Sequence, residues 1–201
     1  MKTGAIVQTR MGSTRLPGKV MLDLCGKPVI EHVIDRLKLS KLLDEIIIAT
    51  TALEMDKVIV EQAKKNGVKW FCGSEDDVLS RYYYAAKEND LDTVIRITSD
   101  CPLIDPVLLD KVVEFYTSNN YILVTNAGND LTQRTFPRDL MLRCFPLKYW
   151  KMPFIMQQKA IRESMLLLIC MKAMKKIYTT LKMIRIILTL GGRWIQAKTL
   201  S

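Results

Sequence analysis

The sequence predicts an α/β domain with a Rossmann-like, doubly wound and mostly parallel sheet, followed by a different segment. Short apolar runs alternate with amphipathic stretches over the first 125 residues, joined by short connections. The 201 residues are 49% hydrophobic, enough to bury an ordinary core. Charge is uneven, because residues 1–140 hold 18 basic and 20 acidic side chains, whereas residues 141–201 hold 12 basic ones and one acid. We therefore expect a domain over residues 1–139 and a basic, methionine-rich tail over residues 140–201.

Five buried strands are expected in the domain. They are the apolar, β-branched runs at residues 2–9, 45–51, 68–72, 92–98 and 121–126. A helical stretch follows each of the first four, which is typical of parallel strands joined by crossovers. Ligands of such sheets bind beyond the carboxyl ends of the strands, so the loops after the first and fourth strands are expected to share one crevice.

Four helices are expected between these strands. They cover residues 28–39, residues 54–66, a stretch that ends near residue 88, and a stretch that starts at residues 105–106. Gly67 is expected to end the second helix, and Ser74 or Asp76 to cap the third. Asp105 and Pro106 suit the start of the fourth, because proline is favourable at the first helical position.

We expect neither an exported protein nor one with a membrane-spanning helix. The sequence begins without the apolar segment and cleavage site of a signal peptide, and no window of about 18 apolar residues is free of charge. The five cysteines have no metal-ligand spacing, so buried or partly buried free thiols in a reducing cytoplasm are expected.

His32 is expected to be a solvated helix residue, and two of Tyr82, Tyr83 and Tyr84 to pack against the core.

The loop after the first strand carries three cations among glycines and hydroxyls. Arg10, Arg15 and Lys19 would suit a polyphosphate, whose charge must be met by donors in a partly dry cleft. The spacing is neither GxGxxG nor GxxxxGK[ST], which disfavours a dinucleotide site and a Walker loop. A solvated basic loop is the alternative interpretation.

Asp100 follows the fourth strand and supplies the complementary chemistry. A carboxylate opposite phosphate-binding cations is the expected anchor for Mg²⁺, which is held by one or two carboxylates together with phosphate oxygens and waters. The alternative is an ordinary turn residue before Cys101 and Pro102.

Taken together, these segments resemble a known family. Residues 5–19 (AIVQTRMGSTRLPGK) are similar to the signature of the cytidylyltransferases that activate 3-deoxy-octulosonate and nonulosonate sugars, and among them to the spore coat polysaccharide biosynthesis protein F group. The match continues in order at residues 26–28, 48–51, 73–79, 96–106 and 134–138, and ends near residue 139.

The resemblance implies a nucleotide-diphosphosugar-transferase-like fold that transfers CMP from CTP to a sugar acid and releases pyrophosphate. Arg15, Lys19 and Asp100 would be catalytic, and Asp100 would hold Mg²⁺. The implied nucleotide-binding residues are Gln8, Arg10, Met11, Gly12, Ser13, Thr14, Arg15, Lys19, Thr50, Ser74 and Asp100. Arg134 and Arg138 would lie near the sugar carboxylate. The family also implies a homodimer, which the altered tail puts in doubt.

From Leu140 onward the resemblance stops. The family continues with an acidic strand, a segment similar to Arg-Glu-His-Val-Thr-Pro-Tyr, and later Arg-Trp-Thr-Val-Asp with a second metal-side carboxylate, none of which occurs in frame. A shift of the reading frame by one base explains the loss of acids. Each new codon then consists of the last base of one residue's codon and the first two bases of the next. In this frame Met171–Lys172 must give Glu and Trp194–Ile195 must give Asp. With permitted codon choices, residues 161–169 become Thr-Arg-Glu-His-Val-Thr-Pro-Tyr and residues 191–195 become Trp-Thr-Val-Asp. We therefore expect a shifted-frame translation from residue 139 or 140 onward.

Two other functions stay open at this point. Taken at face value, the basic tail could bind RNA or an anionic membrane, but its helical pattern is poor and no aromatic platform accompanies the cations. We therefore expect no nucleic-acid or membrane partner. A nucleotidyltransferase for another nucleoside triphosphate, or a glycosyltransferase on the same fold, is the second alternative, because the phosphate loop does not fix the base.

Overall fold

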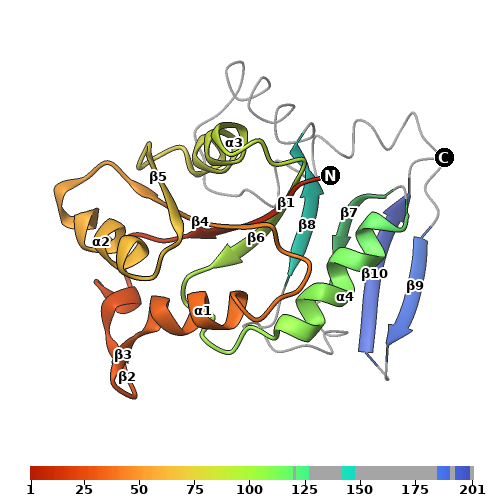
Figure 1. The fold of residues 1–201 in the computed structure, drawn as a ribbon, viewed down its shortest axis with the longest axis horizontal. Helices are drawn as coiled ribbons and strands as arrows, with labels where there is room; N and C mark the ends of the chain where they lie inside the picture. The colour runs from red at the N-terminus through yellow and green to blue at the C-terminus, as the bar shows by residue number, and fades with distance from the viewer. Residues whose placement is uncertain (120, 127–141, 148–184, 191–192, 200–201) are drawn as a thin grey trace.

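The computed structural model describes residues 1–119, 121–126, 142–147, 185–190 and 193–199, which form one large sheet with helices on both faces (Figure 1). Its strands are β1 (Thr3–Gln8), β4 (Glu45–Thr51), β5 (Lys69–Gly73), β6 (Thr93–Thr98), β7 (Tyr121–Thr125), β8 (Arg143–Pro146), β9 (Arg185–Leu190) and β10 (Arg193–Thr199). Their order is β5-β4-β1-β6-β8-β7-β10-β9. The first five in sequence, β1, β4, β5, β6 and β7, are the five expected strands, each within one residue of its expected ends.

The sheet is parallel over the first four expected strands, whereas the fifth, β7, has only antiparallel neighbours. Strand β1 pairs in parallel with β4 and β6, and β4 pairs in parallel with β5. Strand β8 is antiparallel to both β6 and β7, and β10 is antiparallel to β7 and β9. The predicted α/β class is confirmed, with three further strands contributed by residues 143–199.

The helices lie at the expected places. They are α1 (Val29–Leu37), α2 (Lys57–Lys65, preceded by the 3-10 turn η2, Glu54–Asp56), α3 (Val78–Glu88) and α4 (Pro106–Thr117). Asp105 caps α4 by accepting the N–H groups of Val107 and Leu108 at 2.9 and 3.2 Å. The expected cap of α3 was wrong, because Asp77 accepts the Ser80 N–H at 2.9 Å and Ser74 accepts that of Asp77.

Two hydrophobic clusters fill the space between the sheet and its helices. One packs β1, β4 and β6 against α1, α2 and α4, with Ile30, Ile34 and Leu109 fully buried. The other packs the opposite face against α3 around Leu79 and Tyr82. Figure 1 shows α3 on one side of the sheet and α1 and α4 on the other. Successive side chains of a strand lie on opposite faces of the sheet. Each polar residue at the carboxyl end of a strand therefore lies on a defined face.

Gly67 ends α2 as expected, and the geometry explains why glycine is needed. Its φ is +63°, its N–H donates to Lys64 O at 2.9 Å, and the Val68 N–H donates to Ala63 O at 3.1 Å. This pair of bonds is a Schellman motif, whose left-handed residue is strained for side chains other than glycine.

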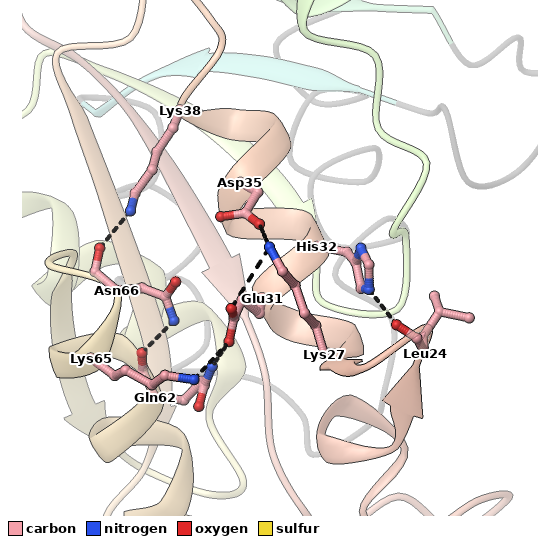
Figure 2. A network of polar contacts seen from close by, with 9 residues as sticks. All are labelled: Leu24, Lys27, Glu31, His32, Asp35, Lys38, Gln62, Lys65 and Asn66. Carbon is pink, nitrogen blue, oxygen red and sulfur yellow. Dashed lines mark hydrogen bonds and ion pairs between the residues drawn. The ribbon is translucent and has the colours of Figure 1, made fainter.

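A polar network ties α1 to α2 and to the hairpin of β2 (Asp23–Leu24) and β3 (Lys27–Pro28) (Figure 2). Glu31 accepts from Gln62, and Lys65 approaches the same carboxylate at 3.3 Å. The Nε2 atom of His32 donates to Leu24 O at 2.6 Å. His32 was expected to be simply solvated, and the structure instead gives it a half-buried place against the hairpin.

The remaining packing expectations are mixed. Tyr82 is fully buried, Tyr83 packs against the same cluster and Tyr84 is 39% exposed, as expected of the three. Of the cysteine thiols in the described residues, those of Cys25 and Cys72 are exposed, contrary to expectation, whereas Cys144 is buried. Cys170 lies outside the described residues. Within those residues, no helix has the length and apolar character needed to cross a membrane.

Candidate functional site

Two loops meet at the carboxyl ends of the adjacent parallel strands β1 and β6. The first follows β1 and leads into the 3-10 turn η1 (Lys19–Met21), and the second holds Ser99 and Asp100. The Nζ atom of Lys19 donates to Oδ2 of Asp100, which joins the two loops by an ion pair. The convergence expected from the strand order is confirmed.

The Asp100 carboxyl is partly exposed and strongly biased toward its charged form. Partial burial raises its pKa, but the hydrogen bond and charge of Lys19, together with a hydrogen bond from Thr98, outweigh burial and hold the pKa below its ordinary value. Its side chain is 42% exposed, so an ion from solvent can reach it. Asp100 therefore offers a charged oxygen ligand at the mouth of the site.

The basic loop is closed on itself by one backbone carbonyl. Met11 O accepts the N–H groups of Ser13 at 2.8 Å and Gly18 at 2.9 Å. Gly18 has a φ of +68°, which favours glycine, so the closure depends on that residue. Arg15 lies exposed on the closed loop, whereas Arg10 at its start and Lys19 at its end are half-buried. The loop thus presents three cations from a fixed frame, as a polyanion site requires.

Other expected nucleotide-binding residues lie at neighbouring strand ends. The hydroxyl of Tyr82 donates to Oε1 of Gln8, at the end of β1, with 3.5 Å between the oxygens. Thr50, near the end of β4, is fully buried, and its hydroxyl has no partner among the described residues. Ser74 follows β5 and is exposed. Thus β1, β4, β5 and β6 all bring expected residues to one edge of the sheet. Thr14 is exposed on the closed loop, and Gly12 has open space where a Cβ would stand.

Arg81 is a buried cation under this edge that the sequence did not single out. Its Nη1 donates to Ser74 O at 2.6 Å and to Glu75 O at 3.3 Å, while Nε and Nη2 have no partner within the described part of the chain. Burial lowers its pKa, as does the charge of Arg10, and Tyr82, Asp56 and Asp77 act in the opposite direction. The site therefore carries more positive charge than its loop alone shows.

Asp56 is a second residue that the sequence analysis missed. It is 1% exposed, and its carboxylate accepts the Met11 N–H at 2.7 Å and the Thr51 hydroxyl. It stands 45 residues from the loop that it contacts, in a stretch without any motif, so no local signal marked it. Only the adjacency of β1 and β4 brings the two segments together.

Two expected site residues cannot be placed, and the metal expectation rests on one carboxylate. Arg134 and Arg138 lie outside the described residues. No group of three or more His, Cys, Asp or Glu side chains that could hold a metal occurs in the described ranges. Mg²⁺ keeps several waters and is often held by one carboxylate plus substrate phosphates, so Asp100 suits a metal that arrives with a nucleotide.

A basic loop after the first strand and a carboxylate after its parallel neighbour are typical of nucleotide-binding α/β proteins, whose ligands lie beyond the carboxyl ends of the strands. Comparison with known proteins makes the class specific. The family model described as Cytidylyltransferase matches residues 4–143. The chain belongs to the cytidylyltransferase family, and the resemblance drawn from its motifs is confirmed.

Curated relatives cover the same part of the chain. An uncharacterized protein of Methanocaldococcus jannaschii is 43% identical over 143 residues, which are 70% of this chain and 59% of the relative. The spore coat polysaccharide biosynthesis protein SpsF of Bacillus subtilis is 36% identical over 128 residues (61% and 53%). A 3-deoxy-manno-octulosonate cytidylyltransferase of Brucella canis is 39% identical over 110 residues (53% and 43%). The matched region spans roughly half the length of these relatives.

A solved structure agrees with the family. The chain is similar to a cytidylyltransferase from Leptospira borgpetersenii, with a TM-score of 0.76 and 35% identity over 87% of this chain and 73% of the other. The expected nucleotidyltransferase-like fold is confirmed by this likeness.

Proposed function

We propose that this protein transfers CMP from CTP to the hydroxyl of a sugar acid and releases pyrophosphate, in surface polysaccharide biosynthesis. The observation that carries the proposal is the closed basic loop of β1 standing against Asp100 of β6. The activity of the Brucella relative, a 3-deoxy-manno-octulosonate cytidylyltransferase, and the role of the Bacillus relative in spore coat polysaccharide biosynthesis support the substrate class. A cytosolic location belongs to the proposal, because the exposed thiols of Cys25 and Cys72 suit a reducing compartment.

The proposed chemistry needs positioning and charge more than a protein nucleophile. The sugar oxygen forms a bond to the α-phosphorus of CTP, the bond from that phosphorus to the bridging oxygen breaks, and the hydroxyl proton leaves to solvent. Arg10, Arg15 and Lys19 hold the triphosphate and stabilise charge that develops on the departing pyrophosphate. Asp100 holds Mg²⁺, which screens the phosphate charges when it is bound.

Other roles belong to the same proposal. Gln8, Met11, Gly12, Ser13, Thr14 and Thr50 complete the nucleotide site, Ser74 lies near the base, and Arg134 and Arg138 meet the carboxylate of the sugar acid. That carboxylate gives the acceptor a charge that an arginine pair can select. A homodimer is part of the family expectation, and the tail puts it in doubt.

The tail leads to a further part of the proposal, that CTP binding by this chain is weakened and its turnover is close to absent. If residues from 139 or 140 onward are read in a shifted frame, the chain lacks the second metal-side carboxylate that the family resemblance implies. Pyrophosphate release with CTP, Mg²⁺ and candidate sugar acids is then expected to be close to background, and sequencing the gene should show the slip near codon 140. An intact frame whose codons cannot spell the restored segments, or rapid turnover, would contradict this part alone.

A further inference from the structure

We propose that Asp56 is a positioning residue of the nucleotide site, whose buried carboxylate fixes the conformation of the basic loop. The inference rests on the proposed function, because the loop is taken to hold the triphosphate. Asp56 does not contact the phosphates in this account. Its negative charge would repel them, and at 1% exposure it is shielded from the mouth of the site.

The direction of its side chain is the first evidence. Asp56 is the last residue of η2 and directly precedes α2, and its backbone is helical (φ −90°, ψ −4°), unlike the extended N-cap residue that accepts an N–H from the first turn of its own helix. Here the carboxylate makes no such bond to the described amides of α2. Its side chain instead makes a long-range contact with Met11, 45 residues away in the sequence.

Asp56 accepts hydrogen bonds from two donors, one at each oxygen of its carboxylate. Oδ1 accepts the Met11 N–H at 2.7 Å, and Oδ2 accepts the hydroxyl of Thr51, which is 2% exposed. The same hydroxyl accepts the Leu53 N–H at 3.2 Å, which leaves its proton to point toward Asp56. A buried carboxylate with two such donors is well fixed, and bonds of this charged type are stronger than neutral ones.

Met11 connects Asp56 to the rest of the basic loop. Its N–H is held by Asp56, and its carbonyl closes the loop onto Ser13 and Gly18. Arg10 precedes Met11 and Lys19 follows Gly18, so two of the three cations are adjacent in sequence to residues of this closure. Loss of the Asp56 contact would release Met11, and with it the spacing of the cations that must meet one triphosphate.

The test compares two alanine variants that each remove a carboxylate bond to a backbone N–H. In Asp56→Ala the bonds from the Met11 N–H and the Thr51 hydroxyl are lost; in Asp44→Ala, the control, a 2.7 Å bond from the Thr3 N–H is lost at the amino end of β1, the strand that leads into the basic loop. With CTP and Mg²⁺ in a calorimeter, Asp56→Ala should bind CTP about tenfold more weakly, and Asp44→Ala within about twofold of the unmodified chain. Asp56→Asn keeps an oxygen acceptor and should recover most of the affinity.

Amide hydrogen exchange provides a readout that does not depend on CTP. Protection at Met11, Ser13 and Gly18 should fall in Asp56→Ala and stay near normal in Asp44→Ala and Asp56→Asn. Unchanged protection of these amides in Asp56→Ala, or equal effects of both alanine variants on CTP affinity, would overturn the inference. If the unmodified chain does not bind CTP but the exchange pattern holds, the proposed function fails and only the effect of Asp56 on the conformation of the loop stands.

Discussion

At the scale of single residues, the site is defined by a cation and a carboxylate that neutralise each other until a ligand arrives. Lys19 and Asp100 come from different loops, and both side chains remain accessible, at 27% and 42%. Partly exposed pairs contribute little to stability, so the pair is better suited to exchange partners than to hold the fold together. In the proposed reaction, Lys19 would pass to a phosphate and Asp100 to Mg²⁺ without the loss of a strong contact.

The pKa of Asp100 gives a prediction with a definite sign. Because that pKa is lowered in the folded state, the contribution of the pair to stability is present above the unfolded value and is lost as the pH falls through the folded pKa. The difference in unfolding free energy between the unmodified chain and Lys19→Met should therefore be constant above about pH 5 and disappear in more acidic solution. Carbon-13 NMR of the Asp100 carboxyl should also show a higher pKa in the variant, and an unchanged pKa would contradict the pairing.

At the scale of elements, the start of α3 shows why caps are harder to predict than helices. Four consecutive residues from Ser74 to Asp77 can all accept a backbone N–H, so the sequence alone does not choose among them. Packing chooses, because burial of Leu79, Tyr82 and Ala86 against the sheet sets the helix register and places Asp77 at the cap.

This assignment predicts different effects for two neighbouring aspartates. Asp77→Ala removes the acceptor for the Ser80 N–H and should lower the free energy of unfolding by about 1 kcal/mol. Asp76→Ala, in which an exposed side chain is truncated, should change it by less than about 0.5 kcal/mol. Urea titrations of the two variants decide the matter, and equal losses would show that the cap is shared or misplaced.

At the scale of the whole molecule, local signals predict the parallel strands and β7, and fail for β8, β9 and β10. Each of β1, β4, β5 and β6 is an apolar run with its own helix after it, so short-range pattern is enough. Strand β8 enters between β6 and β7 from about 50 residues further along than β6, and such antiparallel pairing has no local signature. The convergence of the Lys19 and Asp100 loops followed from strand order, whereas the contact of Asp56 with Met11 joins two segments of which only one carried a motif.

The most direct test of the proposed CTP site is the binding of nucleoside triphosphates to the unmodified chain. Binding is measured as the change in unfolding temperature with Mg²⁺ present. A ligand that binds only the folded state raises the unfolding temperature, and CTP should raise it more than UTP, GTP or ATP. The same CTP shift should be largely lost in Lys19→Met, which removes one cation of the loop and should leave the fold intact. No shift with any nucleotide, or a CTP shift of full size in that variant, would contradict the claim that the loop of β1 and Asp100 form a CTP site.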